Sequence, residues 1–168
     1  MTRVVGLDLS LTATGIAVAG DVRWNGVMHP PAGLREGPRL AWLRDRIGAN
    51  LDHGLDMVVI EDLPINAKSA GLTAQLHGVV KLHLHDGGYP PPILVPAATL
   101  KVFATGRGNA TKIDMVVAAR DRLGYDGTDD NAADAMWLAE LGCHLLGAPT
   151  VTLPLTHTRA LDKVRGAA

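Results

Sequence analysis

Two hydrophobic periodicities alternate along the chain, and together they predict a mixed α/β protein. Short apolar runs typical of buried strands occur five times, and longer segments with apolar residues every three or four positions follow the later runs. The predicted strands span 3–9, 15–19, 22–28, 57–60 and 93–95. The predicted helices span 36–52, 69–86, 98–104, 111–123 and 129–146.

The order of these elements predicts how the sheet is built. Gly20-Asp21 is typical of a hairpin turn, so the first three strands are expected to be antiparallel neighbours. Helices connect the later strands, which favours parallel crossovers. We therefore expect a five-stranded mixed sheet flanked by helices in one domain over residues 1–150, followed by a less patterned, mildly basic tail over 151–168.

Composition excludes several classes of protein. The chain has 168 residues and a formal net charge of -1, which argues against a globally basic nucleic-acid coat but allows a local basic patch. Its one cysteine, Cys143, cannot form an internal disulfide, which favours a reducing compartment. No apolar run approaches the roughly 20 residues of a membrane-spanning helix. We expect a soluble cytoplasmic protein with no membrane partner.

Three acidic residues lie where the pattern predicts buried structure. Asp8 is inside the first apolar strand, Glu61 ends the fourth, and Asp134 lies among alanines in the last predicted helix. A carboxylate in such a place is costly unless it is hydrogen-bonded, paired or bound to a metal. Each acid has a structural alternative: Asp8 could accept from the turn amides that follow it, Glu61 could pair with a lysine, and Asp134 could face solvent.

Converging carboxylates favour a divalent cation. Oxygen ligands suit Mg²⁺, with Mn²⁺ as a substitute, and neither a cysteine pair nor an HExxH motif suggests zinc. Two such ions activate water and stabilise a leaving oxygen in phosphodiester cleavage. The fourth ligand is open between Asp130, which lies on one helical face with Asp134, and Asn131, while Asp129 and Asp130 are also typical helix caps.

Several segments together resemble the RuvC-type Holliday-junction resolvases, which are dimeric, metal-dependent, ribonuclease H-like DNA endonucleases. The segments occur in the family's order and are Gly6-Leu-Asp-Leu-Ser-Leu-Thr-Ala-Thr-Gly15, Val58-Val-Ile-Glu61, Lys101 to Lys112, and Asn131-Ala-Ala-Asp-Ala135. The resemblance implies a ribonuclease H-like fold in which Asp8, Glu61 and Asp134 are three of four metal-binding acids. Asn131 stands where the family has its fourth acid, and Asp130 is the candidate substitute.

The resemblance also points to a DNA-binding segment. The segment from Thr99 to Tyr125 has a local excess of three positive charges, and its glycine loop lets backbone amides approach a phosphate. We expect Lys101, Arg107 and Lys112 to contact DNA, and Lys112 also to neutralise charge on the scissile phosphate. The alternative is a solvated helix face.

The resulting hypothesis is a two-metal endonuclease that nicks branched DNA, resolving four-way junctions as a homodimer through paired symmetric cuts, in a bacterium or in the host of a phage. Asp62-Leu63-Pro64 follows the strand-end acid where some relatives carry an aromatic wedge, so flaps and forks are further candidate substrates. The main alternative is a non-catalytic DNA-binding scaffold of the same fold. An actin-like ATPase is a third interpretation, but 168 residues leave no room for its second domain.

Overall fold

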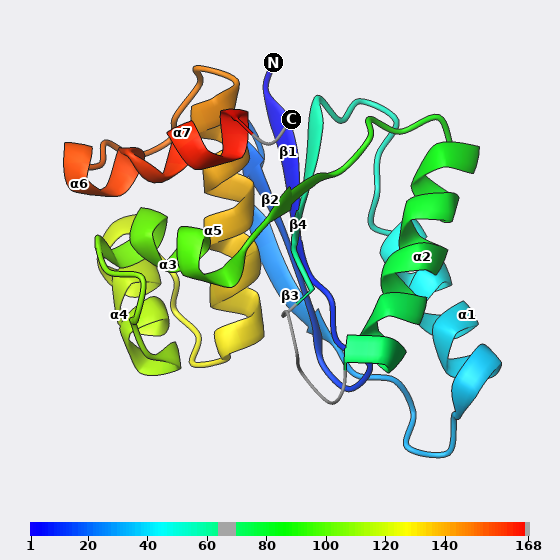
Figure 1. Ribbon diagram of the computed structural model, residues 1–168. Coiled ribbons are helices and arrows are strands. Elements are labelled where there is room, and N and C mark those ends of the chain that lie inside the picture. The colour runs from blue at the N-terminus through cyan, green and yellow to red at the C-terminus, as the bar shows by residue number, and fades with distance from the viewer. Residues whose placement is uncertain (64–69, 167–168) are drawn as a thin grey trace.

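The computed structural model describes residues 1–63 and 70–166 and contains the predicted five-stranded sheet, in the order β3-β2-β1-β4-β5 (Figure 1). The strands are β1 (Arg3–Asp8), β2 (Thr14–Gly20), β3 (Trp24–Met28), β4 (Met57–Glu61) and β5 (Ile93–Val95). The helices are α1 (Glu36–Gly48), α2 (Ala70–Asp86), α3 (Ala97–Thr105), α4 (Lys112–Leu123), α5 (Asp130–Leu145), α6 (Leu155–Thr158) and α7 (Ala160–Arg165).

The strand directions follow from the connections, as predicted. β1, β2 and β3 form an antiparallel meander, whereas β4 and β5 pair in parallel after crossovers through α1 and α2. Within residues 1–150 the predicted elements differ from the structure only at their edges; α1, for example, ends at Gly48 instead of continuing to residue 52. Ser69, the predicted helix start, and Pro64, which is expected to prevent the fourth strand from continuing, lie outside the described residues.

Each face of the sheet has its own hydrophobic core. α1 and α2 cover one face, where Leu43 and Leu76 pack against alternate residues of the strands. The remaining helices cover the other face, and α5 lies along it (Figure 1). Trp137 is fully buried there, whereas Trp42 on α1 is only half-buried.

α5 approaches the sheet unusually closely because two glycines lie beneath it. A Cβ atom on Gly6 of β1 would stand 2.1 Å from the Ala135 carbonyl oxygen. One on Gly15 of β2 would stand 2.0 Å from the Asn131 carbonyl oxygen. Both distances are far inside van der Waals contact, so the first turns of α5 rest directly on the backbone of β1 and β2.

The segment after residue 150 is more ordered than its pattern predicts. It forms α6 and α7, and Leu161 and Val164 are buried in the same core as α5. His157 is buried too, and its Nδ1 lies 2.9 Å from the Phe103 carbonyl oxygen on α3. The tail therefore shares the core of the preceding residues. Within the part of the chain that the structure describes, no helix has both the length and the apolar composition needed to cross a membrane.

Candidate active site

Two acidic residues lie side by side at the carboxyl edge of the sheet. Asp8 ends β1 and Glu61 ends β4. The strands are parallel and Leu7 is paired with Ile60, so the two acids are the next residues on adjacent strands, which run about 4.8 Å apart. Leu7 and Ile60 belong to the core under α1 and α2. Because successive side chains alternate between faces, Asp8 and Glu61 point toward the α5 face.

The third acid comes from α5. Asp134 lies one residue before Ala135, whose carbonyl oxygen rests against Gly6, so the helix carries Asp134 to the end of β1. Its neighbours Ala133 and Ala135 are fully buried. One carboxylate oxygen of Asp134, Oδ1, is itself buried and has no hydrogen-bond partner among the described residues. The solvated alternative for Asp134 is therefore wrong.

The structural alternatives for the other two acids also find no support. The turn after β1 is closed by its own hydroxyls, since the amides of Thr12 and Ala13 donate to Ser10 Oγ at 3.3 and 3.4 Å instead of to Asp8. In residues 1–63 and 70–166, Glu61 forms neither an ion pair nor a side-chain hydrogen bond. Nothing in the described protein therefore compensates these carboxylates directly.

Burial and neighbouring charges raise the pKa of all three acids. Burial is the largest cause in each case, and it raises the pKa of Asp8 to about 6, of Asp134 to about 7 and of Glu61 to about 8. Repulsion by Asp8 adds to the shift of both Glu61 and Asp134, and repulsion by Asp134 adds to that of Glu61. Lys112 opposes all three shifts without cancelling them. The three carboxylates thus form one electrostatic unit.

The donor set fits a divalent cation. Three carboxylates supply the hard oxygen ligands that Mg²⁺ and Mn²⁺ prefer, and the unpartnered oxygen of Asp134 is a buried ligand without another role in the protein. No three acidic, histidine or cysteine side chains in the described residues already stand close enough together to hold an ion. The ligands that a metal centre needs are therefore present, and the side chains of these carboxylates must move closer together to bind an ion.

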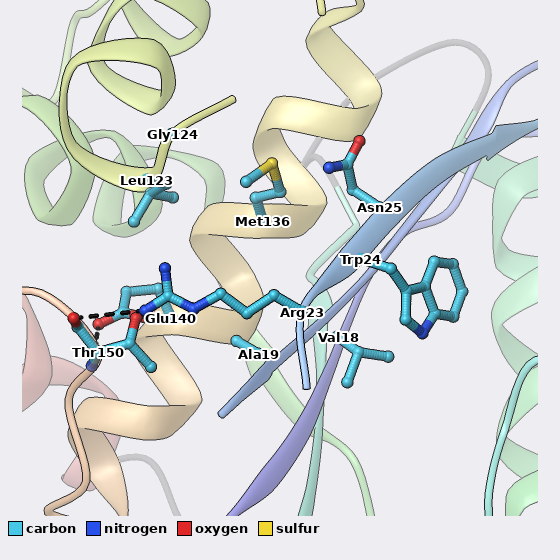
Figure 2. A pocket seen from close by; sticks show the side chains of 10 residues that line it. All are labelled: Val18, Ala19, Arg23, Trp24, Asn25, Leu123, Gly124, Met136, Glu140 and Thr150. Atoms are coloured by element: carbon cyan, nitrogen blue, oxygen red, sulfur yellow. Dashed lines mark hydrogen bonds between the residues drawn. The ribbon is translucent and has the colours of Figure 1, made fainter. Parts of the chain in front are cut away.

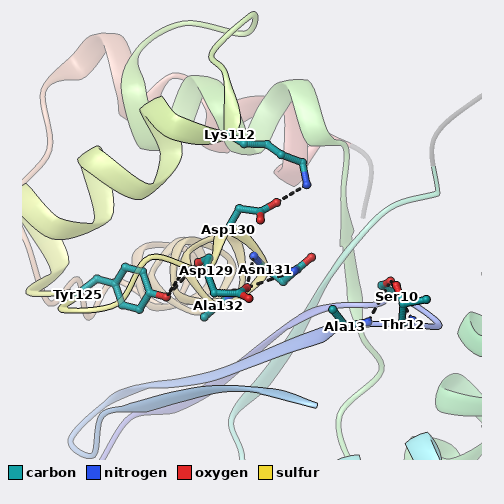
Figure 3. A network of polar contacts seen from close by, with 9 residues as sticks. All are labelled: Ser10, Thr12, Ala13, Lys112, Tyr125, Asp129, Asp130, Asn131 and Ala132. Atoms are coloured by element: carbon teal, nitrogen blue, oxygen red, sulfur yellow. Dashed lines mark hydrogen bonds and ion pairs between the residues drawn. The ribbon is translucent and has the colours of Figure 1, made fainter. Parts of the chain in front are cut away.

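The candidates for a fourth ligand have different surroundings, which Figure 3 shows. Asp129 caps α5, since its carboxylate accepts from the amides of Asn131 and Ala132 at 2.9 and 3.2 Å. Asp130 forms an ion pair with Lys112 at the rim of the acidic cluster. The Asn131 side-chain amide also donates to Asp129, at 3.2 Å. The charge of Asp130 raises the pKa of Asp8 and Asp134, so its carboxylate lies near these two acids.

The basic candidates lie around the same cluster. Lys101 on α3 lowers the pKa of Glu61 and Asp134, although burial outweighs it, so its ammonium group lies near these acids. Lys112 begins α4, and Arg107 lies in the loop before it and pairs with Asp114 at 3.4 Å. The structure therefore brings Lys101 and Lys112 near the acidic cluster, whereas Arg107 lies in the loop between their two helices and pairs with Asp114.

One buried acid lies outside the sequence prediction. Glu140 on α5 is 1% exposed and accepts from the amides of Thr150 and Val151 at 2.9 and 3.1 Å, which fastens the start of the C-terminal segment to α5. The signal was the same as for Asp134, an acid within an apolar helical stretch. Spacing alone could not separate the two, because Asp134 lies at the sheet edge and Glu140 lies farther along the helix.

A mixed five-stranded sheet that carries acids at adjacent strand ends and on the helix packed over them defines a ribonuclease H-like protein, as predicted. No family model matches the chain. A RuvC crossover junction endodeoxyribonuclease of Saccharopolyspora erythraea is 31% identical over 159 residues, covering 88% of this chain and 78% of that protein. The protein of the same name from Frankia alni is 31% identical, covering 89% and 80%. The chain belongs to the RuvC family of crossover junction endodeoxyribonucleases.

Solved structures agree with this fold. Thermus thermophilus RuvC aligns with a TM-score of 0.70 and 18% sequence identity, covering 90% of this chain and all of that one. A second structure of the T. thermophilus protein, in complex with a Holliday junction substrate, aligns with a TM-score of 0.73 over the same share of both chains. The predicted ribonuclease H-like architecture is thus confirmed.

Proposed function

We propose that this protein is a divalent-metal-dependent endonuclease that nicks branched DNA and resolves four-way junctions. The observation that carries the proposal is the trio of half-buried carboxyl groups at the sheet edge, those of Asp8, Glu61 and Asp134, whose pKa values are all raised. The curated relatives are named crossover junction endodeoxyribonucleases, and one structural neighbour was solved with a Holliday junction substrate. Together these support an enzyme acting on junction DNA.

Asp8, Glu61 and Asp134 would hold the metal. We propose Mg²⁺, with Mn²⁺ as a substitute, and two ions per site, with Asp130 or Asn131 as the further ligand. Bound divalent ions activate the attacking water and stabilise the departing oxygen of the phosphodiester. The chain itself supplies ionised carboxylates on fixed elements, two strand ends and a helix resting on Gly6 and Gly15. Such rigid placement is what positions reacting groups accurately.

The basic residues would act on the DNA backbone. Lys112 is paired with Asp130 at the rim of the acidic cluster, so a DNA phosphate can take the place of that carboxylate. Its positive charge would then stabilise the charge that develops on the scissile phosphate. Lys101 and Arg107 would bind neighbouring phosphates, because phosphate contacts dominate nucleic-acid affinity.

We further propose that the enzyme works as a homodimer that makes paired symmetric cuts, since a four-way junction offers two equivalent strands to a two-fold pair of active sites. Its place would be the cytoplasm of a bacterium, or of the host of a phage, where such DNA is found. A non-catalytic scaffold is the weaker alternative, because a scaffold has no use for three neighbouring half-buried carboxyl groups with raised pKa values.

A nicking assay tests the proposal. Synthetic four-way, flap and fork substrates are incubated with the protein with and without Mg²⁺, and strand cleavage is measured alongside binding by gel shift. We expect Asp8→Asn to bind junction DNA but not cut it, whereas Asp45→Asn, on the exposed surface of α1, keeps both activities. Full cleavage by Asp8→Asn, or binding without any cleavage by the unaltered protein in Mg²⁺, refutes it.

A further inference from the structure

The two edges of the sheet are protected very differently. β5 has three residues and is flanked by prolines on both sides, Pro90–Pro92 before it and Pro96 after it. Prolines lack an N–H group and discourage pairing with another strand. β3, at the other edge, is a five-residue strand without proline or charge. In residues 1–63 and 70–166, no backbone group of Trp24–Met28 hydrogen-bonds outside the ladder with β2.

A hollow lies beside β3 on each face of the sheet. On the α5 face, Asn25 of β3 lines a cavity of about 240 Å³ with Arg23 and Met136, and Glu140 lies at its base (Figure 2). On the opposite face, toward which Trp24 turns, a cavity of about 340 Å³ lies beside Trp42. Side chains of an added strand alternate between faces, so one strand would send successive side chains into the two cavities.

The charge along this edge is positive. The guanidinium of Arg23 lies at the first cavity, where it donates to the Thr150 carbonyl oxygen at 3.4 Å. That of Arg46 lines the second, stacked 5.7 Å from the centre of the Trp42 ring. Both residues are exposed, and neither forms an ion pair within the described part of the chain. Glu140 is buried and engaged by Thr150, and Asp21 is the exposed acid of the preceding turn.

We propose that the outer edge of β3 is a docking site for an extended acidic segment of a partner protein, which adds to the sheet as a sixth strand. The open backbone of β3 would supply the main-chain hydrogen bonds, and the two cavities would accept apolar side chains at alternating positions. Arg23 and Arg46 would pair with acidic residues of the segment. The inference does not depend on the proposed nuclease activity, because β2 and β1 separate this edge from Glu61 on β4.

A library of random octapeptides, displayed on a surface and selected on the purified full-length protein, tests the proposal. We expect selected peptides to be acidic and to carry apolar residues at alternate positions. Their dissociation constants, measured by fluorescence anisotropy, should rise about tenfold with the Arg23→Glu/Arg46→Glu double variant, because two exposed ion pairs are lost. The matched control, Arg44→Glu, reverses a charge on the same helix outside both cavities and should leave binding unchanged.

Two further measurements separate strand addition from other modes of binding. Peptides methylated on alternate backbone nitrogens lose ladder hydrogen bonds and should bind at least about tenfold more weakly in one of the two methylation registers. The β3 amides should gain protection from hydrogen exchange when the unmethylated peptide is bound. Cleavage of junction DNA should not change in the charge-reversal variant.

The following results overturn the proposal. Selection yields no acidic alternating sequences, or both methylated forms bind as well as the parent peptide, or a single-stranded oligonucleotide displaces the peptide as well as excess peptide does. The last result identifies a nucleic-acid surface. Self-association of the protein that is lost on charge reversal identifies a second copy of the chain as the occupant instead.

Discussion

Removing one charge from the acidic cluster should stabilise the metal-free protein while abolishing its activity. We take Asp134→Asn, since Asp134 is half-buried and its buried oxygen, Oδ1, has no partner among the described residues. Its pKa is raised from 3.8 to about 7, mainly by burial and then by Asp8 and Asp130. Above pH 7, this rise in the pKa of Asp134 corresponds to about 4 kcal/mol of unfolding free energy. Shared repulsion and the unpaired new amide reduce the expected gain to about 2 kcal/mol.

The pH dependence distinguishes this cause from a general packing effect. A carboxyl group whose pKa is higher in the folded state holds its proton there after the unfolded chain has lost it. The metal-free protein therefore loses stability as the pH rises from the unfolded value of 3.8 to the folded value of about 7. The amide that Asp134→Asn introduces does not ionise, so the variant should gain its advantage over that interval and show little or none near pH 4.

Thermal unfolding followed by circular dichroism in a chelator provides the measurement. At about pH 8 the variant should melt about 4–8 °C above the unaltered protein, since each kcal/mol shifts the melting temperature of a chain this size by about 2–4 °C. Added Mg²⁺ should raise the melting temperature of the unaltered protein more than that of the variant. Asp45→Asn on the surface of α1 serves as control and should differ at neither pH.

The reasoning fails if Asp134→Asn is less stable than the parent at pH 8, or if any gain is equally large near pH 4. The first result would mean that the carboxylate forms a stabilising interaction in the folded protein. The second would mean that packing, and not charge, governs the difference. Either would remove the electrostatic argument for a metal at this position.

Three further changes test separate parts of the structure. Gly15→Ala should destabilise the fold by about 1–3 kcal/mol and abolish cleavage, because the added methyl group pushes α5 off the sheet. Denaturant unfolding and nicking assays measure the two effects. Gly26→Ala is the control and should preserve cleavage, because a Cβ atom at Gly26 would have no neighbouring atom within 4 Å. Lys112→Ala should slow single-turnover cleavage about 100-fold while junction binding falls less. Burial raises the pKa of Glu140, but hydrogen bonds outweigh burial and hold this pKa below 4.5. In thermal melts, Glu140→Gln should therefore lower the stability near pH 7 and have progressively less effect as the pH falls below 4.5. An unchanged melting temperature near pH 7 would contradict the role given to Glu140.

The sheet and its acids were accessible to sequence reasoning because both leave local signals. The unbroken apolar runs before Asp8 and Glu61 mark buried strands, and an acid that ends such a run is conspicuous. The alanines around Asp134 indicate a buried helical face in the same way. These patterns depend on neighbouring residues only, so they can be interpreted without knowledge of distant contacts.

The remaining features depend on long-range packing that leaves no local pattern. α6 and α7 are short, and their burial depends on α3 and α5 lying beneath them. The pairing of Lys112 with Asp130 joins two helices whose relative placement no spacing reveals. Asp129 and Asp130 are adjacent and chemically identical, and only the geometry of the helix start makes one the cap and leaves the other to face Lys112.

Because α5 packs on Gly6 and Gly15, the thermal stability of the fold and the geometry of the candidate active site depend on the same helix. The helix that supplies Asp134 also forms the centre of one hydrophobic core, so the acids cannot drift apart while the rest of the molecule stays intact. Heating should accordingly abolish activity in the same cooperative transition that unfolds the protein, without a folded but inactive state at lower temperature. Selection for greater heat resistance in this lineage would therefore preserve the geometry of the metal site as a by-product.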